Sequence, residues 1–99
     1  MTYTIKLTPD AKIDIEDAKE YYKLKSKKLA KEFLQNVHSA IEPLKTNPFL
    51  FQRGYRGIRK SPIAKFKSSI YYFTEVKTVV IIAVLHNSRN PQMWKNRTE

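Results

Sequence analysis

The longest apolar run in the chain covers residues 79–85 and reads Val-Val-Ile-Ile-Ala-Val-Leu. Most of these side chains are β-branched, and such side chains pack well on a pleated surface but lose freedom in a helix. The run is also short for a buried helix, so it predicts a strand that is buried on both faces. We expect the rest of the chain to be organised around this strand, which delivers His86 and Arg89 at its polar end.

The first residues predict a half-buried strand followed by a helix. Apolar and polar residues alternate over residues 3–7, which is the pattern of a strand with one face on a core. Thr8-Pro9-Asp10 supplies a capping hydroxyl, a proline at the first helical position and an acid in the first turn. The apolar residues that follow are spaced to share one helical face. They are Ala11, Ile15, Ala18 and Tyr22.

A second helix is predicted after a short Lys-Ser-Lys link, in which Ser26 is the capping residue. Its buried stripe consists of Leu29, Phe33, Val37, Ile41 and Leu44. Pro43 removes a backbone hydrogen bond and bends or ends the helix, and Asn47-Pro48 stops it. The two helices therefore read as a helical hairpin that packs on a sheet.

The second half predicts strands. Residues 58–63 predict a strand with Pro62 near its end, and residues 69–75 alternate strongly, with Ile70 and Tyr72 on one face. A turn at residues 75–77 joins this segment to the apolar run as an antiparallel hairpin. The whole chain, residues 1–99, is thus predicted to be one α+β domain. It has an N-terminal strand, a two-helix hairpin and a three-stranded antiparallel C-terminal meander, which together form one mixed sheet with the helices on one face.

Length and composition narrow the class of protein. Ninety-nine residues are enough for a single core but not for two. The absence of cysteine excludes a disulfide framework and a thiolate metal site. No signal-peptide pattern is present at the N-terminus, and no segment approaches the roughly 20 apolar residues of a membrane span. We therefore expect a soluble cytoplasmic protein without a membrane partner.

The charge distribution is strongly asymmetric. Residues 1–52 contain 9 basic and 7 acidic residues, whereas residues 53–99 contain 10 basic and 2 acidic residues and carry a net charge of +8. All five arginines fall in the second half. Arginine binds phosphate and carboxylate through its planar fork, so the asymmetry predicts a polyanionic partner, either nucleic acid or an acidic protein. The alternative is a solvated basic surface that keeps a small protein soluble.

The sequence contains no glycine loop for phosphate, no Gly-x-Ser-x-Gly elbow and no histidine pair at metal-ligand spacing. It therefore predicts neither a cofactor nor a metal. What remains is a set of basic residues that would gather along one edge of the sheet if the last three strands are adjacent. This set consists of Arg56, Arg59, Lys60, Lys65, His86 and Arg89. Simple alternation would place His86 on the same face of its strand as Val80, Ile82 and Val84.

A metal-free ribonuclease requires a proton-transfer group and cations that hold the scissile phosphate. His86 has a suitable intrinsic pKa for proton transfer, Arg59 and Arg89 are candidates to clamp phosphate, and Lys65 could assist. The alternative is structural, with His86 hydrogen-bonded at a strand end and the arginines paired with the acidic helices. Further candidates for binding nucleic acid or another target are Arg56, Lys60, Lys65, Trp94 and Arg97.

The sequence resembles the RelE/ParE superfamily of bacterial type II toxins over nearly its whole length. The resemblance is carried by residues 17–22 (Asp-x-x-x-Tyr-Tyr), 29–33 (Leu-Ala-x-x-Phe), 57–60 (Gly-Ile-Arg-Lys) and 65–72. The most specific stretch is residues 84–91, Val-Leu-His-Asn-Ser-Arg-Asn-Pro, followed by Trp94 and Arg97. It is similar to the Val-x-His-x-x-Arg ending of ParE-like and plasmid-stabilisation members.

The resemblance implies a toxin that inhibits growth and forms a hetero-oligomer with a cognate antitoxin. RelE-like members cut mRNA on the ribosome. Arg59 and Arg89 match basic positions of that branch, and His86 could serve as base or acid. ParE-like members poison DNA gyrase instead. No tyrosine follows Arg89, and Trp94 has no phenolic proton to donate. This departure favours the ParE-like branch, with mRNA cleavage as the alternative and a non-toxic basic binding module as a third possibility.

Overall fold

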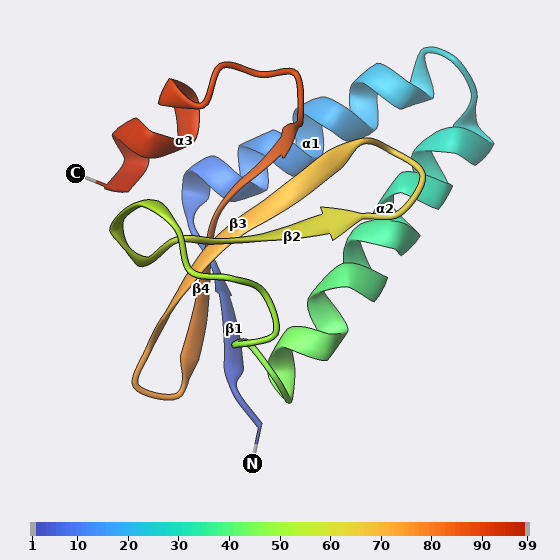
Figure 1. Ribbon diagram of the computed structural model, residues 1–99. Helices are drawn as coiled ribbons and strands as arrows, with labels where there is room; N and C mark the ends of the chain where they lie inside the picture. The colour runs from blue at the N-terminus through green and yellow to red at the C-terminus, as the bar shows by residue number, and fades with distance from the viewer. Residues whose placement is uncertain (1, 99) are drawn as a thin grey trace.

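The computed structural model describes residues 2–98, and its centre is a four-stranded sheet in the order β1-β4-β3-β2 (Figure 1). The strands are β1 (Thr4–Leu7), β2 (Arg59–Ile63), β3 (Ser68–Glu75) and β4 (Thr78–His86). The apolar run forms β4, which is buried along nearly its whole length between β1 and β3. β1 pairs with β4 in parallel, whereas β2-β3-β4 is an antiparallel meander. The predicted mixed α+β sheet is confirmed.

The helical hairpin consists of α1 (Pro9–Lys23) and α2 (Lys27–Ile41). The Thr8 side chain accepts a hydrogen bond from the Ala11 amide at 3.2 Å, and Ser26 accepts one from Leu29 at 3.0 Å, so both predicted caps are present. A 3₁₀ helix, Glu42–Lys45, follows α2 directly. This change of helix type occurs at Pro43, where an α-helical hydrogen bond cannot form.

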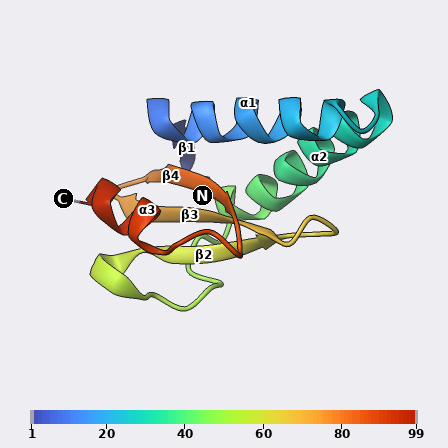
Figure 2. The same ribbon diagram turned by 90° about the horizontal axis from the view of Figure 1, so that it is seen from above.

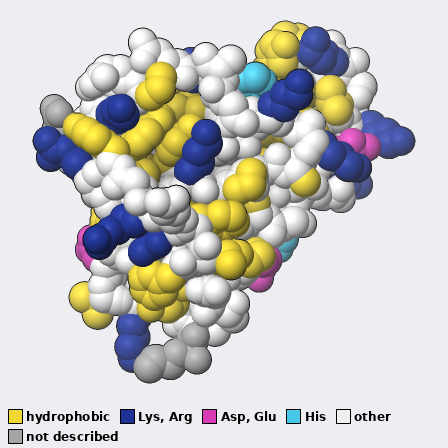
Figure 3. Space-filling model, in the orientation of Figure 1, with side chains coloured by type: hydrophobic (Ala, Val, Ile, Leu, Met, Phe, Trp, Pro, Cys, Tyr) yellow, Lys and Arg dark blue, Asp and Glu magenta, His cyan; other side chains and the backbone are white. Residues whose placement is uncertain are grey.

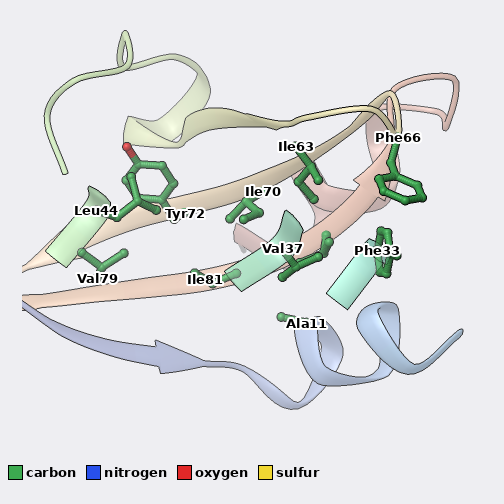
Figure 4. Close-up of a cluster of buried hydrophobic side chains, with 11 residues drawn as sticks. Ala11, Phe33, Val37, Leu44, Ile63, Phe66, Ile70, Tyr72, Val79 and Ile81 are labelled. Atoms are coloured by element: carbon green, nitrogen blue, oxygen red, sulfur yellow. The ribbon is translucent and has the colours of Figure 1, made fainter. Parts of the chain in front are cut away.

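The larger hydrophobic cluster lies between the helical hairpin and one face of the sheet (Figure 4). Phe33, Leu44 and Ile81 are completely buried in it. The Tyr72 hydroxyl, at the rim of this cluster, donates a 2.7 Å hydrogen bond to the Pro48 carbonyl, so the ring is buried without leaving its polar atom unpaired. The predicted stripes of both helices supply the opposing side chains, which confirms that the hairpin packs on the sheet.

The opposite face of the sheet has a much smaller cover. This cover consists mainly of the C-terminal segment, residues 87–98, which contains the short helix α3 (Gln92–Lys95). Helices α2 and α3 lie on opposite sides of the sheet (Figure 2). Trp94 of α3 stacks on Tyr71 of β3, with 4.8 Å between ring centroids and 20° between ring planes. The second cluster consists of Ile58, Tyr71, Val80, Ile82, Ala83 and Leu85, with Phe73 and Trp94 packed against it.

A β-bulge in β4 changes which side chains share a face. The register passes from Tyr71↔Ala83 to Tyr72↔Ile81, so Ile82 has no partner on β3. Ile82 belongs to the cluster under α3, like Val80, whereas Val84 belongs to the cluster under the helical hairpin. The prediction that Val80, Ile82, Val84 and His86 share one face is therefore wrong, because the extra residue reverses the alternation. It directs Val84 and His86 towards α1.

Candidate functional site

The two residues proposed to flank a scissile phosphate, Arg59 and His86, lie at different ends of the sheet. Arg59 begins β2 and pairs with Tyr72, which in turn pairs with Ile81 in the middle of β4. His86 ends β4 and pairs with Ser68, at the start of β3. β2 and β4 run in the same direction, so the beginning of one is distant from the end of the other. The prediction that the basic residues gather along one edge with His86 is therefore wrong for Arg59, and also for Arg56 and Lys60 at the same end of β2.

Arg59 instead anchors the loop before β2. Its Nη1 atom donates a 2.6 Å hydrogen bond to the Phe51 carbonyl, and its guanidinium lies over the Phe49 ring, 5.1 Å from the centroid. Burial raises the pKa of the neighbouring Tyr72 hydroxyl, and the positive charge of Arg59 opposes part of that increase. These contacts give Arg59 a structural role on the helix side of the sheet.

His86 and Arg89 lie close together after the end of β4. The Ser88 amide donates to His86 Nδ1 at 3.1 Å, and the Ser88 hydroxyl lies 2.8 Å from the same nitrogen. A ring nitrogen that accepts a hydrogen bond carries no proton, so the neutral ring holds its proton on Nε2. Arg89 donates from its backbone amide to the His86 carbonyl and from Nη1 to the Met93 sulfur. Lys65 lies in the turn between β2 and β3, at this same end of the sheet.

A groove of about 670 Å³ runs between α1, the end of β4 and the C-terminal segment, and we call it the α1 groove. Its exposed apolar side chains are Ile13, Tyr21 and Met93. Its charged side chains include Lys25 and Arg89 as well as acidic residues of α1. The α1 groove is therefore an amphipathic surface of the size that small ligands and peptide segments occupy.

Arg97 and Asp14 both line the α1 groove and form a partly buried ion pair. Its Nη1 and Nη2 atoms donate to the two carboxylate oxygens of Asp14 at 2.6 and 3.1 Å, and Nη1 also donates to the Ile82 carbonyl at 3.0 Å. Asp14 accepts a further 3.0 Å hydrogen bond from the Val84 amide. The pairing of β4 with β1 ends at Ile81. Beyond that point, Asp14 and Arg97 provide the hydrogen-bond partners for the Val84 amide and the Ile82 carbonyl of β4. The hydrogen bond from Arg97 to Asp14 raises the pKa of Arg97, which stays charged.

A second, smaller pocket of about 320 Å³ lies under α3, and we call it the aromatic pocket. Its rings come from Tyr55, Tyr71 and Trp94, and its cations are Lys60 and Lys95. Lys95 Nζ lies 5.0 Å from the Tyr55 centroid and 5.8 Å from the Trp94 centroid, and Lys60 Nζ lies 5.9 Å from that of Tyr71. These are distances at which a cation interacts with the face of a ring.

The sequence predicted Lys60 and Trp94 as binding residues but not Tyr55, Tyr71 or Lys95. Arg56, also predicted, lies beside this pocket, 5.6 Å from the Tyr55 centroid. The sequence gives little indication that the missed residues belong to a site. Tyr55 lies in a loop and Tyr71 in a strand, and the sequence does not show that the loop and the strand come together. Lys95 directly follows the predicted binding residue Trp94, and this adjacency is the signal that could have identified it.

Comparison with known proteins adds a family to this geometry. The family model described as "ParE toxin of type II toxin-antitoxin system, parDE" matches residues 5–91. The chain belongs to the ParE toxin family. A search of curated proteins finds no match. Among solved structures, the fold of this ParE-family chain is similar to one titled "Chromosomal ParDE TA system from P. aeruginosa". The TM-score is 0.76 at 17% sequence identity, and the match covers 86% of this chain and 96% of that one.

Two kinds of feature are absent from the part of this ParE-family chain that the structure describes. Among residues 2–98, no group of three or more His, Asp and Glu side chains is arranged to hold a metal ion. No helix within the same residues has both the length and the apolar character of a membrane span. Two surfaces that concentrate side chains capable of binding are the α1 groove and the aromatic pocket.

Proposed function

We propose that this chain is a growth-inhibiting toxin that acts on DNA gyrase in the cytoplasm and is neutralised by a cognate antitoxin. The observation that carries the proposal is the ParE family match over residues 5–91. Inhibition of gyrase is the activity that the resemblance to ParE-like members implies. The excess of basic residues after residue 52 suits contact with an acidic partner or with DNA bound to the target.

The separation of Arg59 from His86 supports gyrase over mRNA as the target. A nuclease needs its proton-transfer group and its cations around one phosphate, within a few ångströms. Here Arg59 holds the Phe51 carbonyl on the helix side of the sheet, and Nδ1 of His86 is occupied by Ser88. Of the two arginines predicted to clamp a phosphate, Arg89 lies beside His86 and Arg59 does not. Trp94, the aromatic residue after Arg89, has no phenolic proton for a leaving group.

The α1 groove is the surface that we propose for the antitoxin. Ile13 and Tyr21 are each 56% exposed, which is high for large apolar side chains that line a groove. An acidic segment that folds on binding would cover these side chains and place carboxylates near Lys25 and Arg89. We expect nanomolar or tighter binding that weakens as salt increases, in a toxin-antitoxin hetero-oligomer. Equal affinity at low and high ionic strength would remove the electrostatic part of this proposal.

One experiment separates the two targets. Purified protein is incubated in parallel with gyrase and supercoiled DNA, and with programmed ribosomes. The proposal predicts loss of supercoiling activity or accumulation of double-strand breaks in the first reaction, and intact mRNA in the second. Cuts at defined codon positions, with gyrase unaffected, would establish the RelE-like alternative. No effect in either reaction would contradict a gyrase toxin and leave a basic binding module.

A matched pair of variants makes the same assays diagnostic. Arg89→Ala removes an exposed cation beside His86, and Lys12→Ala removes an exposed cation from the first turns of α1. If mRNA cleavage were the activity, Arg89→Ala and His86→Gln would each slow the chemical step by at least about 100-fold. A gyrase toxin would lose affinity at most, and the Lys12→Ala control would retain full activity in both cases.

A further inference from the structure

The aromatic pocket is not used by the proposed antitoxin contact, and it combines aromatic rings with cations. Three aromatic rings and two lysines surround a space of about 320 Å³, and none of the described residues that line it is acidic. Figure 3 shows hydrophobic side chains bordered by lysine and arginine where α3 lies. Ring faces combined with cations are the pattern by which proteins hold unpaired nucleotides, through base stacking and phosphate contact.

The loop before β2 holds Tyr55 in place. The Gly54 amide donates to the Ile58 carbonyl at 2.8 Å, and the Ile58 amide donates to the Tyr55 carbonyl at 2.9 Å. Arg56, with φ of 51°, and Gly57, with φ of 80°, both adopt left-handed conformations inside this tight turn. A non-glycine residue adopts this conformation at a cost in free energy. The strained turn places the Tyr55 ring edge-on to Trp94, with 6.0 Å between centroids.

Packing alone does not account for this arrangement. The stack of Trp94 on Tyr71 covers the second cluster, but Tyr55 is 40% exposed and lies outside that cluster. Lys95 lies over both Tyr55 and Trp94. A base inserted beside these two rings would therefore find a stacking surface on Tyr55 and an ammonium group close to both rings that could contact its phosphate. Lys60, at the Tyr71 ring, is positioned for a second phosphate of the same strand.

We propose that the aromatic pocket binds an unpaired nucleotide of a single-stranded nucleic acid, with its base stacked on Tyr55 beside Trp94 and with Lys60 and Lys95 on the strand's phosphates. The ring faces favour a nucleic-acid strand over an acidic peptide, because carboxylates would use the lysines but have no use for the rings. The net charge of +10 suits a strand better than a free nucleotide. This site does not depend on gyrase being the target.

Trp94 is the only tryptophan in the chain, so its fluorescence reports on this pocket directly. Full-length protein is titrated with oligodeoxythymidine of ten nucleotides, oligouridine of the same length, a DNA duplex, thymidine monophosphate and polyglutamate. The proposal predicts quenching by one or both single strands, with little quenching by the duplex or polyglutamate even where they bind. Oligodeoxyuridine of the same length, which differs from oligouridine only in the sugar, identifies the preferred sugar.

Variants test the roles of individual side chains. Tyr55→Ala should weaken oligonucleotide binding on the order of tenfold, and Tyr55→Phe, which keeps the ring, should restore it. Lys60→Ala combined with Lys95→Ala should weaken binding and flatten its salt dependence, by about 0.7 in log-log slope for each phosphate that a lysine no longer neutralises. Lys12→Ala combined with Lys77→Ala removes the same charge from exposed positions elsewhere and should change affinity little.

The wild-type titrations decide the matter even if a variant fails to fold. Quenching by polyglutamate equal to that by oligodeoxythymidine would show that the pocket responds to negative charge and would overturn the proposal. Equal affinity for thymidine monophosphate and the ten-nucleotide strand would overturn the assignment to a strand. Absence of quenching by both single strands would overturn it entirely. None of these results depends on whether the protein inhibits gyrase, so the two proposals fail separately.

Discussion

The two faces of the central sheet are covered in very different ways. On one face, two helices of 15 residues each close a cluster that contains 11 buried hydrophobic residues. On the other, a helix of four residues and a loop cover a cluster of six, and Trp94 remains partly exposed. Burial of apolar area is the main source of stability, so the helix side supplies most of the folding free energy. The α3 side leaves rings and cations accessible, which is what a binding surface requires.

The largest loss of stability is expected from a substitution in the central strand β4, which is covered on both faces of the sheet. Ile82 is 4% exposed and lies in the bulge of β4. Ile82→Asp would bury an unpaired carboxylate, at a cost of several kcal/mol against a total stability of roughly 5–15 kcal/mol for a small domain. We expect loss of cooperative unfolding in thermal and denaturant melts. A soluble variant with a cooperative transition would show that the Ile82 side chain is not buried under α3 in solution.

The helix side is tested by Phe33→Ala. Phe33 is completely buried and packs against Tyr22 and Phe66, with ring centroids 5.1 and 5.3 Å away. Removing such a ring leaves a cavity and costs about 3–5 kcal/mol. Chemical denaturation at constant m-value measures the loss. Leu34→Ala, at an exposed neighbouring position of α2, is the matched control and should cost far less. Similar losses for both variants would contradict the assigned helix face.

The ion pair that fastens the C-terminal segment should have an intermediate effect. Arg97→Ala leaves Asp14, whose side chain is 9% exposed, with only the Val84 amide as partner. We expect a loss of about 2–3 kcal/mol, since the carboxylate is largely desolvated and its charge-assisted bidentate partner is removed. A double-mutant cycle with Asp14→Asn isolates the pair. Independent, additive losses would mean that the two side chains do not hold each other in solution.

The smallest effect is expected on the α3 side. Trp94 stacks on Tyr71 but is partly exposed, so Trp94→Ala should cost about 1–2 kcal/mol, less than Phe33→Ala. The measurement is again denaturant unfolding, followed by circular dichroism because the fluorescent residue is removed. Trp94→Phe, which keeps a ring on Tyr71, should recover much of the loss. A cost equal to that of Phe33→Ala would mean that both faces contribute equally to stability.

Local patterns were sufficient to predict most of the fold. The β-branched run gave β4, the capping residues Thr8 and Ser26 gave the helix starts, and Pro43 gave the end of α2. Each of these signals depends on neighbours in the sequence, which is why it could be read without the structure. The four-residue helix α3 carried no such signal, because it is too short to show a periodic face.

The arrangement of the candidate site depended on contacts that no local pattern contains. The bulge at Ile82 reversed the expected alternation, and the parallel course of β2 and β4 separated Arg59 from His86. Arg97 finds Asp14 at a sequence separation of 83 residues, so its ion pair was invisible in the sequence. The family resemblance, carried by residue types in order along the chain, predicted the family but not these placements.

Growth of bacteria that express the chain tests the central claim most directly. The wild-type protein should arrest growth, co-expression of a cognate antitoxin should restore it, and Ile82→Asp, which we expect not to fold, should be harmless at equal expression. This pattern would identify a folded toxin rather than a burden of expression. Normal growth at good soluble expression of the wild-type chain would contradict the account.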